Sequence, residues 1–118
     1  MTNNNRDIWV VDLVRSVAQP VTFDPGSDWT AAWSWDGSRL VFGSTRSHSD
    51  GTTRIYEKSS TGAGTETVLP SGDVSSIPVH WSADGKYIVF SRQRQLGNTS
   101  SYDTWLLPLF GDRKPTPL

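Results

Sequence analysis

The side chains best suited to acid–base or metal chemistry in this chain are its histidines and the aspartates of two Asp-Gly pairs. A metal site or a catalytic triad needs at least three such groups close together. Only two histidines occur, His48 and His80, and they are far apart in the sequence. Neither Asp36-Gly37 nor Asp84-Gly85 has a second acidic residue nearby, and Asp with Gly favours a tight turn. We therefore predict turns at both aspartates, with no catalytic residue and no metal ligand.

Other motifs that would indicate an enzyme or a cofactor site are incomplete or absent. Gly62-Ala63-Gly64 resembles the start of a dinucleotide-binding loop, but Thr67 stands where the third glycine belongs and no helical pattern follows. Arg6-Asp7-Ile8 lacks the histidine and asparagine of a kinase catalytic loop, and the Gly-x-Ser-x-Gly motif of hydrolases is missing. We therefore predict no enzyme activity and no cofactor for this chain; a kinase or hydrolase domain would lie outside it.

An internal repeat is the strongest pattern in the sequence. Residues 33–42 (Trp-Ser-Trp-Asp-Gly-Ser-Arg-Leu-Val-Phe) recur as residues 81–90 (Trp-Ser-Ala-Asp-Gly-Lys-Tyr-Ile-Val-Phe), displaced by 48 positions (81 − 33). A second series with nearly the same spacing consists of Ile8-Trp9-Val10-Val11, Ile55-Tyr56 and Trp105-Leu106-Leu107. A fixed period of about 40–50 residues is typical of proteins built from stacked repeats, including β-propellers.

Local composition within the repeat predicts strands and turns. The apolar stretches are rich in Val, Ile, Trp, Tyr and Phe and are bounded by Gly, Ser, Asp and Pro, which favours strands. The two Asp-Gly pairs predict two-residue hairpins. Leu40-Val41-Phe42 and Ile88-Val89-Phe90 are apolar without alternation, so both faces of these strands should be covered. No segment has a helical period, and the predicted fold class is all-β.

The number of expected strands predicts a partial β-propeller with about two and a half four-stranded antiparallel blades. A closed propeller uses about four to eight blades of 40–45 residues, so 118 residues are too few to close a ring. Residues 7–29 would form the outer two strands of one blade, 30–70 a complete blade, and 78–118 a second complete blade. The expected strands lie near residues 8–12, 19–23, 30–34, 39–43, 54–58, 66–69, 79–82, 86–91, 103–107 and 115–118.

Composition excludes some classes of partner. A net charge of −1 with 19% charged residues gives no nucleic-acid-binding footprint, and no run approaches the roughly 18 apolar residues of a membrane span. The six tryptophans fit aromatic packing between blades, and we predict that role for Trp33 and Trp81. The first and last blades would expose apolar faces, so we expect the isolated chain to be marginally stable and to self-associate.

The residues also resemble a known family. The pattern Trp-Ser-x-Asp-Gly, an apolar strand, and then Asp-Ile-Trp-Val-Val-Asp-Leu at residues 7–13 resembles the TolB-type propeller repeat, a relative of the WD-type repeats. Residues 22–28, 62–66 and 107–115 (Leu-Pro-Leu-Phe-Gly-Asp-Arg-Lys-Pro) look like the C-terminal propeller of bacterial transmembrane serine/threonine kinases. Trp35 and Ala83 depart from the family, which usually has Pro before Asp-Gly.

The resemblance implies a non-catalytic module for sensing or for protein interaction, within a larger receptor-kinase-like protein. It implies a protein or peptide partner and a location on the periplasmic or extracytoplasmic side of a membrane. TolB-type propellers also cap prolyl-oligopeptidase-like hydrolases, so the alternative is a propeller that gates substrate access to a peptidase. A kinase domain and membrane span upstream would favour the first context, and a Gly-x-Ser-x-Gly segment downstream the second.

Loop positions predict where a partner would bind. In a propeller, the loops that enter the inner strand share one face with the loops between the second and third strands. Here these are residues 24–29 and 72–77, and residues 46–53 and 92–101. Loops on a rigid scaffold commonly carry recognition.

Five residues on these loops are the candidate partner-binding residues. Aromatic residues and arginines are enriched at binding hot spots. The candidates are Asp28, Trp29, His48, Arg92 and Arg94.

Overall fold

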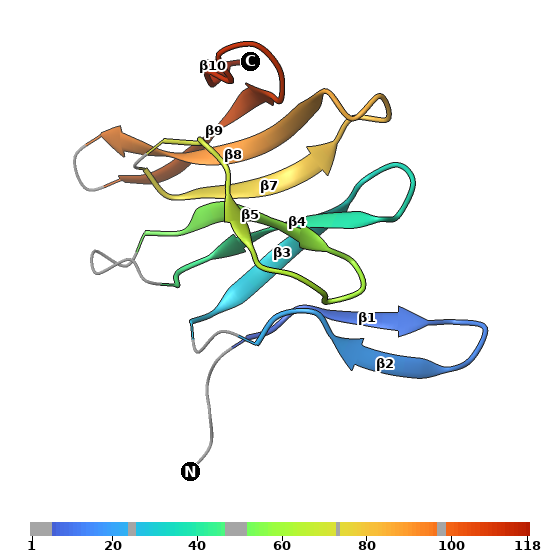
Figure 1. Ribbon diagram of the computed structural model, residues 1–118. Helices are drawn as coiled ribbons and strands as arrows, with labels where there is room; N and C mark the ends of the chain where they lie inside the picture. Colours follow the sequence, from blue (N-terminus) through green and yellow to red (C-terminus); the bar gives the residue numbers. More distant parts are fainter. Residues whose placement is uncertain (1–5, 24–25, 47–51, 73, 97–98) are drawn as a thin grey trace.

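The computed structural model describes residues 6–23, 26–46, 52–72, 74–96 and 99–118. These residues form ten strands, and none of them belongs to a helix that could cross a membrane. The strands are grouped in three antiparallel sheets that follow one another along the chain (Figure 1). The first sheet is β1 (Trp9–Asp12) and β2 (Val17–Pro20).

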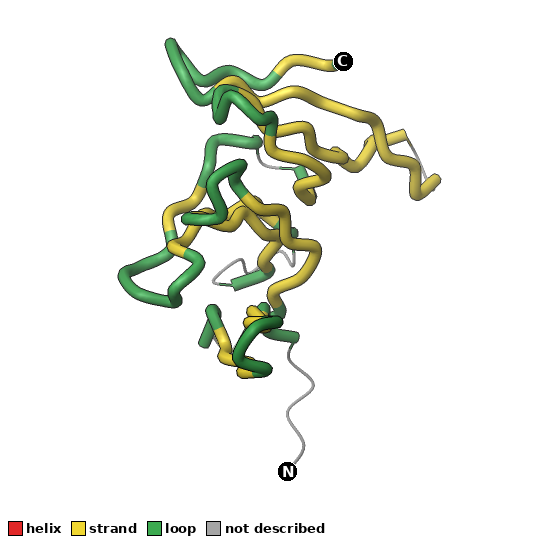
Figure 2. The backbone as a smooth tube through the Cα atoms, turned by 90° about the vertical axis from the view of Figure 1, so that its right-hand side faces the viewer, coloured by secondary structure: helices red, strands yellow, loops and turns green. Residues whose placement is uncertain are grey.

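Each of the other two sheets is a meander of four strands. The second sheet has the order β3-β4-β5-β6 and the third has the order β7-β8-β9-β10. Their inner strands, β3 and β7, pack against one another, and the three sheets are stacked in layers (Figure 2). The strands are β3 (Asp28–Trp33), β4 (Arg39–Ser44), β5 (Arg54–Ser59), β6 (Thr67–Val68), β7 (Ser76–Trp81), β8 (Tyr87–Leu96), β9 (Thr99–Pro108) and β10 (Thr116–Pro117).

One backbone hydrogen bond recurs in all three sheets and identifies the two-stranded sheet as the outer half of a blade. The bond extends the pairing of the last two strands of each sheet. Its three copies are Val21 N to Ile8 O at 2.8 Å, Leu69 N to Ile55 O at 2.8 Å, and Leu118 N to Thr104 O at 3.0 Å. Therefore β1 and β2 are equivalent to β5 and β6, and to β9 and β10. The predicted all-β partial propeller is confirmed.

A buried apolar cluster lies between the two complete blades. It contains Val41 and Ile55 from one blade and Ile88, Phe90 and Leu107 from the next, each with no exposed area. Ala32, Trp105 and Leu109 pack around it. Because no single sheet of this size has a core of its own, this seam is where the hydrophobic effect stabilises the stack.

Strand β4 is buried on both faces, as its unbroken apolar run predicted. Val41 faces the next blade, while Leu40 and Phe42 face the two-stranded sheet, because successive side chains of a strand point to opposite sides. Lys58 lies beside Leu40 in the register and donates to the carbonyl of Val21, directly after β2, at 2.7 Å. This contact fixes which side of β4 meets the two-stranded sheet.

Trp33 and Trp81 occupy equivalent positions but differ in burial. Trp81 lies beside Ile88, faces the neighbouring complete blade and is 7% exposed. Trp33 lies beside Leu40, faces the two-stranded sheet and is 50% exposed. In the described part of the chain, the two-stranded sheet has no strand on the inner side of β1. No such strand therefore covers the Trp33 side chain. The prediction of packing between blades is therefore confirmed for Trp81 and wrong for Trp33 in this structure.

The two Asp-Gly segments form turns, but these are longer than the predicted two-residue hairpins. Ser34 N donates to Arg39 O at 2.9 Å, so four residues lie within the turn. Gly37 has a φ of 74°, whereas Asp36 is not among the residues with positive φ. A two-residue hairpin of the predicted type needs two positive φ values. The turn at Asp84 repeats the same bonds.

The aspartate side chains hold these turns together, which confirms turn chemistry as their role. Asp36 Oδ1 accepts from the hydroxyls of Ser38 and Ser34 at 2.7 and 2.8 Å. Donation by the Ser38 hydroxyl and N–H, and then by Ser34, lowers the pKa of Asp36 from 3.8 to about 2. Asp84 accepts in the same way from Ser82 at 2.6 Å, and its pKa is also lowered. The Ser-x-Asp-Gly motif is thus a structural turn signal.

Two predicted boundaries differ from the structure. The second strand was expected at 19–23 but begins at Val17, because the turn after β1 is shorter than the turns after β5 and β9. Residues 92–101 were expected to form a loop. Most of this segment is paired instead, since β8 continues to Leu96 and β9 begins at Thr99. Residues 97 and 98 lie outside the described residues.

Gly43 lies where the two complete blades approach closely. A Cβ atom at this position would lie 2.9 Å from Thr53 Cγ2, 3.1 Å from Ile77 Cγ2 and 3.5 Å from Trp29 Cδ1. The two nearest atoms belong to β-branched side chains, which have little rotamer freedom to move away. The absence of a side chain at Gly43 therefore allows these residues to pack against the β4 backbone.

We predict that Gly43→Ala destabilises the protein by about 1–3 kcal/mol, the usual cost of overpacking. Ser91→Ala is the matched control, because Ser91 holds the equivalent position in the next blade (43 + 48) and already carries a Cβ. Denaturant unfolding of both variants measures the difference. Equal stability of Gly43→Ala and the wild type would contradict the close packing described here.

Candidate interaction surface

A pocket of about 490 Å³ opens between the two complete blades, at the end of the sheets where β3 and β7 begin. Each of the four segments that were predicted to share one face contributes to its lining. The lining residues are Trp29, Thr45, Thr52, Thr53, Ser75, Ser76, Ile77, Gln93 and Tyr102. These segments follow or precede paired strands. The backbone hydrogen bonds of the sheets therefore hold the residues that line the pocket in place.

The pocket combines two aromatic side chains with neutral hydrogen-bonding groups. Trp29 is 37% exposed and Tyr102 is 53% exposed. The other polar lining side chains are serine and threonine hydroxyls and the amide of Gln93, and none of the described lining residues carries a charge. Tyr and Trp offer large contact areas with a polar tip. The arrangement is suited to recognition of a partner surface.

Two contacts hold Trp29 in place. Its ring lies next to Gly43, its partner in the β3–β4 register. The guanidinium carbon of Arg6 lies 5.5 Å from the ring centroid, in cation–π contact. A second, smaller pocket of about 340 Å³ adjoins this ring, and Trp29 and Thr45 line both pockets. The Trp29 side chain thus lines two adjoining pockets.

Asp28, the neighbour of Trp29, is buried and does not reach this surface. Its side chain is fully enclosed, and Oδ1 accepts from Arg46 Nη2 at 2.8 Å. Arg46 also contacts Glu66 Oε1 at 2.9 Å. This corrects the expectation that the Asp28 carboxylate is available to a partner: it neutralises a buried arginine.

Four charged side chains of the described residues meet around Arg46. Lys58 Nζ lies 3.4 Å from Glu66 Oε1, so Arg46 and Lys58 lie beside Asp28 and Glu66, between the middle blade and the two-stranded sheet. Burial works to lower the pKa of Arg46, but the hydrogen bonds to Asp28 and Glu66 outweigh it and raise the pKa. Burial also works to raise the pKa of Glu66, and the bond from Arg46 reverses this and lowers it. Arg46 and Glu66 are therefore held in their charged forms near neutral pH.

Arg92 and Arg94 lie on strand β8 and do not line the pocket at Trp29. Arg94 is exposed and forms a two-pronged ion pair with Asp103 on β9, with Nε 3.1 Å from Oδ2. This pairing raises the pKa of Arg94 and lowers the pKa of Asp103. Arg92 is stacked on Trp105 in a different pocket. His48 lies outside the described residues.

Of the four predicted residues that the structure describes, only Trp29 lines this pocket. Tyr102 was missed because it lies between the predicted loop at 92–101 and the strand expected at 103–107. Its aromatic side chain next to a polar segment is the sequence signal that could have found it. Among the described residues, no three His, Cys, Asp or Glu side chains are close enough to hold a metal ion.

Comparisons with known proteins support the fold. No protein-family model and no curated protein matches the chain. The crystal structure of TolB from Acinetobacter baumannii aligns with a TM-score of 0.71 and 21% sequence identity, over 95% of this chain and 26% of that one. A TolB-type structure from Agrobacterium tumefaciens aligns with a TM-score of 0.61 and 24% identity, over 85% of this chain and 32% of that one.

The chain thus has the fold of a TolB-like β-propeller, as the repeat pattern indicated. It spans about a quarter to a third of the length of these two solved structures, which agrees with a partial propeller. The match concerns the fold and leaves the finer resemblance to kinase propellers as a hypothesis.

We predict that Asp28→Asn destabilises the protein by about 3 kcal/mol, the lower end of the range for breaking a buried ion pair, because Arg46 retains Glu66. Asp103→Asn is the matched control. It removes a carboxylate from an exposed pair, which is worth at most about 1 kcal/mol. Denaturant unfolding compares the two variants, and equal losses of stability would show that Asp28 is not the structural anion described here.

Proposed function

We propose that this chain is part of a β-propeller that binds a protein or peptide partner through the surface around Trp29 and Tyr102. The observation that carries the proposal is the pocket between the two complete blades, with its two partly exposed aromatic rings and its neutral hydrogen-bonding rim. Tryptophan and tyrosine dominate binding hot spots, which lie near the centre of an interface in packed surroundings. Trp29 has such surroundings, since Gly43 and Arg6 hold its ring.

The pocket is also suited to a preorganised interface. Its walls come from two blades that are joined by the apolar cluster and by the contact at Gly43. Groups that are already ordered lose little entropy when a partner binds. The hydroxyls of the serines and threonines can donate or accept, so they fit the backbone groups of a polypeptide.

The larger context remains a hypothesis drawn from sequence. The string at residues 107–115 favours a receptor-kinase-like protein with its propeller on the extracytoplasmic side of a membrane. The alternative is a propeller that gates a prolyl-oligopeptidase-like peptidase. The coding sequence on either side of this chain distinguishes these contexts, because a kinase domain with a membrane span and a hydrolase domain have different motifs.

A photo-crosslinking amino acid at position 102 tests the interaction surface in living cells. We expect a covalent adduct with a partner protein whose yield falls about tenfold or more on Trp29→Ala, the loss typical of a hot spot. Trp35→Ala is the matched control, because Trp35 is 80% exposed in the turn at the other end of β3. No adduct, or an equal effect of both substitutions, would contradict the proposal.

A further inference from the structure

A second pocket, distinct from the one at Trp29, lies between the outer strands of the two complete blades. Its volume is about 640 Å³, and residues around β6 form one wall while residues of β8, β9 and the segment before β10 form the other. We call it the rim groove. Its cationic lining residues are Arg54, Arg92 and Lys114, and Trp105, Pro70 and Pro115 are prominent among its apolar ones.

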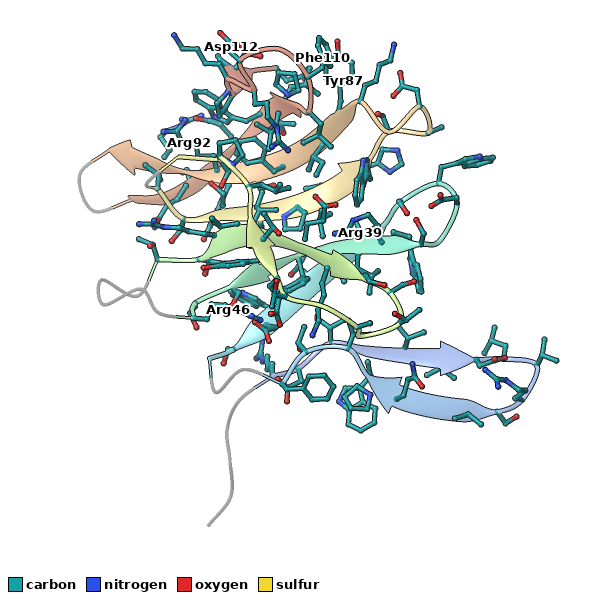
Figure 3. The ribbon with its side chains drawn as sticks, in the orientation of Figure 1. Arg39, Arg46, Tyr87, Arg92, Phe110 and Asp112 are labelled. Carbon is teal, nitrogen blue, oxygen red and sulfur yellow. The ribbon has the colours of Figure 1, made fainter. Side chains whose placement is uncertain are left out.

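Arg92 is held rigidly inside the rim groove. Its guanidinium carbon lies 4.3 Å from the centroid of the Trp105 ring. The guanidinium also lies close to Gly72, where an added Cβ would be 3.3 Å from Nη2. Figure 3 labels Arg92 on the sheet of β7 to β10. Stacking on an aromatic ring fixes the plane of a guanidinium, while its N–H donors lie in that plane and remain able to donate. Arg92 is thus positioned in advance to meet a planar acceptor.

The carboxylate nearest to Arg92 in the sheet is already engaged. Asp103 lies directly opposite Arg92 in the β8–β9 register, but both of its oxygens accept from Arg94. Among the described residues, no carboxylate forms an ion pair with Arg92 or with Lys114, and none lines the rim groove. Arg92 and Lys114 therefore bring two positive charges that no described carboxylate pairs with, next to apolar side chains.

We propose that the rim groove binds an acidic peptide segment in which a Glu or Asp side chain is next to an apolar residue. The carboxylate would accept from the Arg92 guanidinium, whose fork matches a carboxylate in two parallel hydrogen bonds. Lys114, in the segment before β10, would supply a second positive charge from the same wall. The neighbouring apolar side chain would cover Trp105 and the prolines. A bare inorganic anion would leave that apolar wall exposed to water, which favours a peptide as the occupant.

The test uses the intact protein and a fluorescent, acetylated and amidated peptide with the core sequence Leu-Glu-Leu-Glu-Leu. Arg92→Met keeps the apolar stem of Arg92 but removes its charge and donors. We expect it to weaken binding about tenfold or more, the loss for a hydrogen bond to a charged group. Arg94→Met is the matched control on the same strand, because Arg94 is exposed and paired with Asp103. It should bind as the wild type does.

Further measurements keep the test decisive. Lys114→Met should also weaken binding, and since Lys114 is exposed it provides the result if Arg92→Met fails to fold. A peptide with Gln in place of Glu should bind at least tenfold more weakly. Equal affinity of the Glu and Gln peptides, an unchanged affinity in Lys114→Met, or displacement of the peptide by an equal concentration of inorganic phosphate would overturn the proposal.

Discussion

The whole structure depends on covering both faces of its central strands. β4 has apolar side chains on both sides, with Leu40 and Phe42 facing the two-stranded sheet and Val41 facing the next blade. A strand of this kind is stable only between two other sheets, because exposed apolar area costs about 25 cal/mol per Å². Three sheets stacked face to face cover both faces of the middle sheet, whereas a sandwich of two sheets would cover only one face of each.

The same constraint creates the two candidate binding surfaces. Twisted sheets fit closely at the apolar cluster but diverge from one another away from it. One of the resulting pockets is lined by Trp29 and Tyr102, beside the inner strands. The other is lined by Arg92 and Trp105, near the outer strands. Both pockets therefore lie along the seam between the complete blades, and their walls are as rigid as that seam.

The repeat made the architecture predictable, since residues 33–42 and 81–90 carry the turn and the buried strand of each blade. The environment of a single side chain was not predictable when it depended on a neighbouring sheet or a distant residue. Trp33 and Trp81 have the same sequence context but face different partners. Asp28 is internal because Arg46, 18 residues away, meets it. Arg92 and Arg94 appeared to be loop residues because a polar hairpin lacks the apolar pattern of a strand.

A double-mutant cycle across the seam tests the central claim most directly. Val41 and Phe90 belong to one cluster from adjacent blades, whereas Leu40 lies on the opposite face of β4. Alanine substitutions at Val41 and Phe90 should be coupled by at least about 0.5 kcal/mol in unfolding free energy, while those at Leu40 and Phe90 should be additive within about 0.5 kcal/mol. Additivity of the Val41 and Phe90 substitutions, or equal coupling of both pairs, would contradict the stacked-blade account.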